Sequence, residues 1–149
     1  VSVGRLDIPS EGLIILTNSP SLSSYLENPK NRIVRKYRVN FFGRVSESFV
    51  REVSKNLIIK GIKYEKIKIR MLTQKNNKNS AEISLREGKN REIRNILNFF
   101  GHRVDYLCRL EYGPFKLGSL QEGKLIEINK NTLDKYLKKI DFKNENNFW

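Results

Sequence analysis

One carboxylate near the start of the chain has the surroundings of a reactive group. Asp7 follows Arg5 closely and stands between the apolar residues Leu6 and Ile8. Apolar neighbours predict partial burial, and an ionised carboxylate in such a place needs a partner of opposite charge. We expect Arg94, far along the chain, to be that partner, which leaves Arg5 free to face a ligand. Such a pair would hold a carboxylate ready for chemistry.

The expected partner belongs to a second basic segment, which opens a predicted helix at Asn90. Lys89, Arg91 and Arg94 crowd the start of this helix, and only Glu92 opposes them. A helix N-terminus carries partial positive charge, so basic residues there cost stability unless an anion binds. A phosphate or a carboxylate is the natural candidate, and a solvated basic face is the alternative.

Tyr37 is an aromatic residue inside a basic strand, between Lys36 and Arg38. An aromatic ring with flanking cations suits a nucleic-acid base that leaves its stack, because the ring stacks on the base while the cations hold the backbone. The alternative is that Tyr37 packs in the core beside Val39 and Phe41, which the spacing alone favours.

Asp7 has two further interpretations. It could organise the turn that the following residues predict, which include Pro9 and Gly12. It could also pair with Glu11 as the two carboxylates of glycosidases do, although the turn between them leaves the geometry of such a pair open.

The charge of the chain predicts a polyanionic partner. The 149 residues contain 29 Lys and Arg against 16 Asp and Glu, a formal net charge of +13. The basic residues are spread along the chain, which favours a shaped basic surface over a disordered arm. No apolar stretch approaches the roughly 20 residues of a membrane span, so we expect no membrane association.

The single cysteine and the single histidine exclude two kinds of site. Cys108 has no second cysteine with which to form an intrachain disulfide, so a reducing cytoplasm is the expected compartment. Cys108 and His102 together cannot supply the ligands of a structural zinc site. We therefore expect no metal.

Patterns of apolar residues predict the elements that must position these groups. The predicted strands cover residues 12–17, 33–42, 64–71, 81–85, 103–111 and 124–128. The predicted helices cover residues 20–27, 47–55, 90–100 and 132–140, and a polar loop covers residues 74–80. Interleaved strands, hairpins and helices predict an α+β fold with a mixed, largely antiparallel sheet flanked by helices.

The length of the chain suits one domain with a single sizeable core. We expect this domain over residues 1–141, followed by a polar, frayed tail over residues 142–149. The first residue is Val1 rather than Met, which predicts a fragment of a protein with a further N-terminal part.

Four segments, in order, resemble one known family. They are GRLD (4–7) with SEGLIILTN (10–18), RKYRV (35–39), LREGKNREIR (85–94) and YGPFKLG (112–118). This pattern resembles the catalytic domain of bacterial ribosomal-RNA pseudouridine synthases of the RsuA/RluB type, over about residues 3–128. The resemblance implies an isomerase that converts a uridine of folded ribosomal RNA to pseudouridine without cofactor or metal.

The resemblance also implies a role for each site residue. Asp7 would be the essential carboxylate and would attack either the anomeric carbon of the ribose or carbon 6 of the uracil. Tyr37 would lie against the flipped base and help to remove the carbon-5 proton, and Arg94 would form an ion pair with Asp7. The residues implied to contact RNA are Arg5, Lys36, Lys89, Asn90 and Arg91.

The resemblance implies ribosomal RNA as partner, with the large subunit slightly favoured over the small. Relatives usually carry a small RNA-binding domain before this one and a first strand of the catalytic domain, and we expect both to be missing here. We expect a monomer. The alternative function is a non-catalytic ribosomal-RNA-binding module that keeps the basic cleft.

Overall fold

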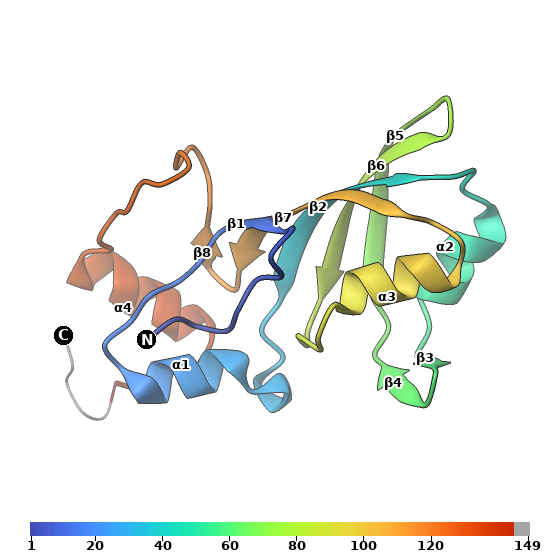
Figure 1. The fold of residues 1–149 in the computed structure, drawn as a ribbon. Coiled ribbons are helices and arrows are strands. Elements are labelled where there is room, and N and C mark those ends of the chain that lie inside the picture. The colour runs from blue at the N-terminus through green and yellow to red at the C-terminus, as the bar shows by residue number, and fades with distance from the viewer. Residues whose placement is uncertain (145–149) are drawn as a thin grey trace.

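The computed structural model describes residues 1–144 and contains a six-stranded sheet with helices beside it (Figure 1). Four long strands run in the spatial order β7-β2-β6-β5, and each neighbouring pair is antiparallel. The long strands are β2 (Arg35–Phe42), β5 (Lys68–Lys75), β6 (Lys78–Leu85) and β7 (Val104–Tyr112). Two short strands also pair with β7: β1 (Glu11–Gly12), which is parallel to it, and β8 (Phe115–Lys116).

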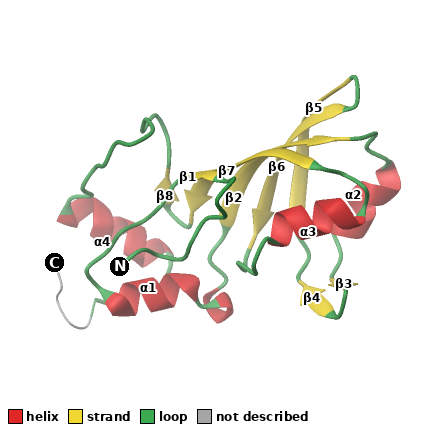
Figure 2. Ribbon diagram, viewed as in Figure 1, coloured by secondary structure: helices red, strands yellow, loops and turns green. Residues whose placement is uncertain are grey.

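The helices lie at the two ends of this sheet (Figure 2). At one end are α2 (Glu47–Val53) and α3 (Glu92–Phe99), and at the other are α1 (Pro20–Glu27) and α4 (Lys130–Lys139). A short 3-10 helix covers Pro29–Asn31, and β3 (Leu57–Ile59) forms a separate hairpin with β4 (Ile62–Tyr64). The prediction of an α+β fold with a mixed, largely antiparallel sheet is confirmed. No helix within residues 1–144 is long and apolar enough to cross a membrane.

Apolar residues form two buried clusters, one at each end of the sheet. In the first, Val39, Phe41 and Ile83 point from one sheet face toward the inner sides of α2 and α3. In the second, Val3 and Leu13 of the N-terminal segment pack with residues of α1, α4 and the end of β7. The N-terminal segment thus belongs to the second cluster, while α3 belongs to the first.

Capping residues set the start of the predicted helices. The Ser19 hydroxyl accepts a hydrogen bond from Leu22 N (3.2 Å) ahead of Pro20, and the Ser46 hydroxyl accepts one from Phe49 N (3.1 Å). Each bond satisfies a backbone N–H that the helix cannot, which contributes about 1 kcal/mol. The predicted helices over residues 20–27 and 47–55 are confirmed, although the second ends at Val53.

Two predicted strands are wrong. Of residues 12–17, only Gly12 is in a strand, and Leu16 forms one isolated bridge with Ser2. Side chains along this run alternate, so Leu16 is 63% exposed instead of buried. Residues 124–128 form no strand, since no strand edge pairs with them, and Leu125 is 80% exposed.

The predicted loop over residues 74–80 is wrong, because this polar stretch forms the end of a β-hairpin. β5 and β6 continue to Lys75 and from Lys78, so only Asn76 and Asn77 lie outside the strands. Both asparagines have positive φ (53° and 60°), the geometry of the tight turns that match strand twist. The predicted strand 64–71 is split, because β4 ends at Tyr64 and β5 begins at Lys68.

The predicted helix at Asn90 begins two residues later, at Glu92, because Arg91 has a left-handed backbone (φ 53°). The last helix extends beyond its prediction at the start, where Asn129 caps it. Phe142, placed in the frayed tail, packs edge-on against Tyr25, with ring centroids 5.2 Å apart. Residues 145–149 of the predicted tail lie outside the described residues.

Candidate active site

Asp7 lies on a tight turn that is fixed at both sides. Ser10 N donates a hydrogen bond to Asp7 O (2.8 Å), which closes the turn. Before it, Gly4 N donates to Glu27 Oε1 (2.7 Å), and after it, Leu13 N donates to Arg109 O on β7 (2.9 Å). The backbone of Asp7 thus forms the turn, and its side chain stays free for another role.

Arg94 of α3 contacts both ends of this turn. Its Nε lies 3.6 Å from Asp7 Oδ2, and its Nη2 donates a hydrogen bond to Ser10 Oγ (3.1 Å). Both side chains of the ion pair are largely buried, with 12% of Arg94 and 24% of Asp7 exposed. Low exposure strengthens the attraction between the charges, so the guanidinium orients the carboxylate. Ser10 was not among the predicted residues.

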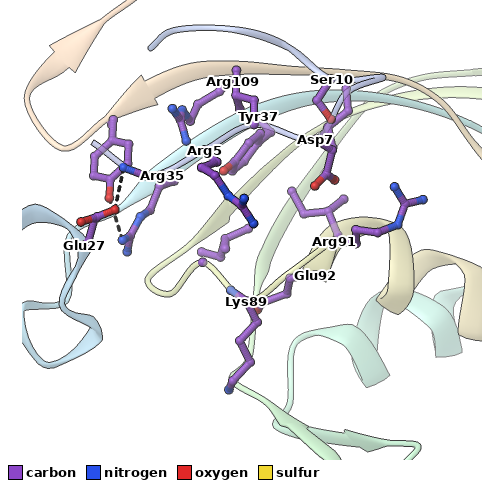
Figure 3. A pocket seen from close by; sticks show the side chains of 17 residues that line it. Arg5, Asp7, Ser10, Glu27, Arg35, Tyr37, Lys89, Arg91, Glu92 and Arg109 are labelled. Carbon is purple, nitrogen blue, oxygen red and sulfur yellow. Dashed lines mark hydrogen bonds between the residues drawn. The ribbon is translucent and has the colours of Figure 1, made fainter. Parts of the chain in front are cut away.

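Beside this pair is a cavity of about 180 Å³ (Figure 3). Most of its wall comes from the Asp7 turn, the start of β2, strand β7 and the loop that leads into α3, and single residues of α1 and β6 complete it. Five of the predicted residues line it, namely Arg5, Asp7, Tyr37, Lys89 and Arg91. The volume is below the ~300 Å³ of pockets for drug-sized ligands, so it suits a single ring or base.

The two interpretations of Tyr37 both hold in part. Its side chain is half-buried and packs against the first cluster, yet it also lines the cavity. In Figure 3 the Tyr37 ring lies between Arg5, which is below and to the left of it, and Asp7, which is to its right. A planar group in the cavity would therefore meet an aromatic ring.

Three of the predicted residues have partners outside the cavity. Lys36 does not line the cavity and forms an ion pair with Glu111 (3.8 Å). Asn90 is exposed beside the cavity, and its carbonyl accepts a hydrogen bond from Asn95 Nδ2 (3.3 Å). Lys89 lines the wall, but its Nζ bonds to Glu87 Oε2 (2.9 Å) and to a backbone carbonyl.

Two arginines of the cavity wall were not predicted. Arg35 and Arg109 are each only 3% exposed, and both line the cavity. Their guanidinium carbons lie 4.7 Å and 5.0 Å from the centroid of the Tyr112 ring, which favours the cations. In the sequence, each of these arginines stands at an inward-facing position of a strand whose other inward residues are mostly apolar. A search for alternating apolar residues does not select such a position.

A pair of carboxyl groups supports the loop before α3. Burial, and after it the hydrogen bond with Glu87, raises the pKa of Glu92 to about 8. Burial also opposes ionisation of Glu87, but hydrogen bonds from Glu65 N and Lys89 outweigh it and lower the pKa of Glu87. Glu92 Oε1 accepts from Lys89 N (3.1 Å), and at neutral pH the pair carries about one negative charge rather than two.

This arrangement, a carboxylate oriented by a guanidinium beside a basic, ring-sized cavity in an α+β fold, agrees with the comparison to known families. Residues 1–99 match the family described as RNA pseudouridylate synthase, and the chain belongs to this family. Within it, the chain is of the RsuA/RluB type.

Individual relatives agree with this assignment. An uncharacterised RNA pseudouridine synthase of Rickettsia felis is 43% identical over 135 residues, which are 91% of this chain. The ribosomal large subunit pseudouridine synthase B of Buchnera aphidicola is 35% identical over 148 residues, or 97% of this chain. The chain spans 58% of the length of each of these two proteins.

A solved structure has the same fold. The crystal structure of a pseudouridylate synthase superposes with a TM-score of 0.82 at 23% sequence identity. The match covers 91% of this chain and 58% of that one. At this identity the likeness supports the fold and not the substrate.

Proposed function

We propose that this chain catalyses the isomerisation of a uridine in ribosomal RNA to pseudouridine, with Asp7 as the attacking carboxylate. The observation that carries the proposal is the 3.6 Å approach of Arg94 Nε to Asp7 Oδ2 beside a basic cavity of ring size. Family membership supports the type of reaction, and the geometry supports the choice of residues.

The proposed reaction begins with a uridine that leaves its stack and enters the cavity. Extrusion costs a few kcal/mol, which a loop or bulge reduces. The base would lie against Tyr37 while Asp7 attacks the ribose or carbon 6 of the ring. The bond from the sugar to nitrogen 1 then breaks, the ring turns, and carbon 5 bonds to the sugar. The bond to Asp7 breaks, carbon 5 loses its proton, and nitrogen 1 gains one. Substrate and product are isomers, so the reaction needs no oxidant or reductant.

The basic residues around the cavity would bind the RNA backbone. Arg5 and Arg91 are exposed and line the cavity, where they can reach the phosphates beside the extruded nucleotide or fill its place in the stack. Lys89 and Asn90 would contact RNA at the rim. Lys36 would do so from outside the cavity, where Glu111 already partners it.

Ribosomal RNA is the proposed substrate because of one named relative, the large-subunit enzyme of Buchnera aphidicola, and because of the net charge of +13. The large subunit is accordingly favoured. We propose residues 1–141 as a catalytic unit that works as a monomer in the cytoplasm, with an RNA-binding domain before it in the whole protein.

Pseudouridine mapping in ribosomal RNA tests the proposal. A strain without the gene should lack one or a few pseudouridines, and the full-length gene should restore them while its Asp7→Asn form does not. If wild type and Asp7→Asn leave the same pattern, the alternative of a non-catalytic RNA-binding module holds.

A further inference from the structure

Arg109 is a buried cation whose donors are only partly used. Its Nε donates a hydrogen bond to Leu13 O (2.9 Å), but its Nη2 is buried and has no hydrogen-bond partner among residues 1–144. No carboxylate in that part of the chain forms an ion pair with it. A buried charge without these partners is costly, so a ligand that supplies an acceptor would offset the cost.

Arg35 differs from Arg109 in this respect. Its guanidinium donates to Ile33 O (2.9 Å), Leu26 O (3.1 Å) and the Tyr112 hydroxyl (2.9 Å). Its hydrogen bonds hold α1 against the sheet, which is a structural role. Of the two buried arginines in the cavity wall, Arg109 is therefore the one with capacity left for a bound molecule.

The sheet places Arg109 beside Tyr37. The two residues are direct partners in the antiparallel register of β2 and β7, and both line the cavity. In the view of Figure 3, Arg109 lies on the opposite side of Tyr37 from Asp7. A ring that lies against Tyr37 with its sugar at Asp7 would therefore turn its far edge toward the Arg109 side of the cavity.

We propose that Arg109 is a further catalytic residue, whose guanidinium donates a hydrogen bond to a carbonyl oxygen of the bound uracil. The inference rests on the proposed function. The cavity can hold one ring, and the far edge of uracil carries carbonyl acceptors that match an arginine N–H.

This hydrogen bond would strengthen during the reaction. If Asp7 attacks the ribose, the bond to nitrogen 1 breaks and its electron pair spreads onto the carbonyl oxygens of the departing ring. If Asp7 attacks carbon 6, the electron pair of the 5,6 double bond passes to the carbonyl at carbon 4. Arg109 keeps its proton in both routes, and the charge leaves the oxygen when the product forms. A fixed cation next to an oxygen that gains charge stabilises that state selectively.

Arg109 also anchors the Asp7 turn, through the bond to Leu13 O and the approach of Gly12 to its backbone. A loss of activity in an Arg109 variant would therefore not separate anchoring from contact with the base. An altered substrate separates the two roles. Replacing a carbonyl oxygen of uracil by sulfur changes a hydrogen bond to the base but does not affect the anchoring of the Asp7 turn.

The test pairs variants with altered substrates. RNA carrying the target uridine is compared with the same RNA carrying 2-thiouridine or 4-thiouridine at that position, because sulfur is the weaker acceptor. Single-turnover rates are measured for the full-length protein and for Arg109→Met, Arg109→Lys and Arg91→Met. Circular dichroism shows which variants fold, and Arg109→Lys serves if Arg109→Met does not fold. Arg91→Met is the control, since Arg91 is an exposed cation of the same cavity.

Wild type and Arg91→Met should lose about tenfold or more in rate with one of the two thio substrates. The folded Arg109 variant should be slow with uridine and show little further loss with that substrate. Equal thio effects in wild type and Arg109 variants at both positions would overturn the inference. A wild-type protein that does not convert uridine at all would instead overturn the proposed function.

Discussion

Arg94 Nε lies 3.6 Å from Asp7 Oδ2, although the two residues stand on segments that pack in different apolar clusters of the molecule. Arg94 extends from α3, whose apolar side packs in the first cluster, and Asp7 lies on a segment anchored in the second. The ion pair therefore spans the junction of two independently packed regions. Its geometry depends on both, which makes it sensitive to changes on either side.

Replacing Arg94 should remove most activity. Arg94→Ala would leave the largely buried Asp7 carboxylate without its partner, a change that typically costs about 3–5 kcal/mol for a buried pair. We expect a fall in kcat/KM of at least a hundredfold, measured with a ribosomal-RNA transcript. Ser10→Ala is the matched control, because it removes only the 3.1 Å bond to the same guanidinium and should cost about tenfold or less. Wild-type turnover in Arg94→Ala would show that the ion pair is irrelevant.

Gly12 should tolerate no side chain. Its φ is +110°, and a Cβ there would lie 2.4 Å from Arg109 O, a backbone atom of β7. We expect Gly12→Ala to lower the free energy of unfolding by about 3 kcal/mol or more, since strain adds to a clash that only a backbone shift can relieve. Gly61→Ala separates the two effects, because Gly61 also has positive φ (+80°) but an added Cβ meets nothing within 4 Å. Gly61→Ala should lower the free energy of unfolding by about 1 kcal/mol, as measured by urea denaturation. An equal loss in Gly12→Ala and Gly61→Ala would refute the clash.

Glu92 should make stability depend on pH. Its pKa is raised to about 8 in the folded state, so the folded protein holds a proton that the unfolded chain releases above the ordinary pKa of 4.5. This contribution to stability is present below pH 4.5 and is lost as the pH rises toward 8. Glu92→Gln should therefore become more stable than wild type as the pH rises through this window, as measured by thermal unfolding.

Glu87→Gln provides the opposite control. The pKa of Glu87 is lowered, so its charge stabilises the fold above the unfolded-state value and the contribution is lost as the pH falls. The variant should be less stable than wild type at neutral pH, with the difference shrinking in acid. If both substitutions shift stability in the same direction at pH 8, the assignment of one proton to this pair is wrong.

RNA binding should weaken steeply with salt. Each lysine or arginine that contacts a phosphate adds about 0.9 to the slope of log affinity against log salt concentration. Arg91→Ala should reduce this slope by about one. Lys55→Ala should leave it unchanged, because Lys55 follows α2 and pairs with Glu52 (3.3 Å). Filter binding across a salt series measures both, and equal slopes in all three proteins would exclude Arg91 from the interface.

Local patterns predicted most of the fold, because caps and side-chain alternation act over a few residues. Ser19 and Ser46 set helix starts, and the alternation of Val39 and Phe41 with polar residues set β2. The wrong predictions are strands whose formation depends on pairing with a distant segment of the chain. Apolar residues such as Leu125 suggested a strand, but no strand edge pairs with them.

Part of the site could likewise be predicted from the sequence and part could not. Asp7 and Arg94 were expected to meet, and the 3.6 Å approach places them together. Arg35 and Arg109 were not predicted as site residues, because the sequence does not show that a cation is buried until its neighbours in the fold are known. Arg109 contacts the Tyr112 ring within β7, and Arg35 contacts it from the neighbouring strand β2.

The most direct test of the central claim uses purified full-length protein, a ribosomal-RNA transcript and the Asp7→Asn variant. Conversion of uridine to pseudouridine and binding affinity are measured on the same samples. Wild type should convert the uridine, and Asp7→Asn should bind within a few-fold of wild type but convert none. Conversion by Asp7→Asn at the wild-type rate would contradict a reaction that depends on this carboxylate.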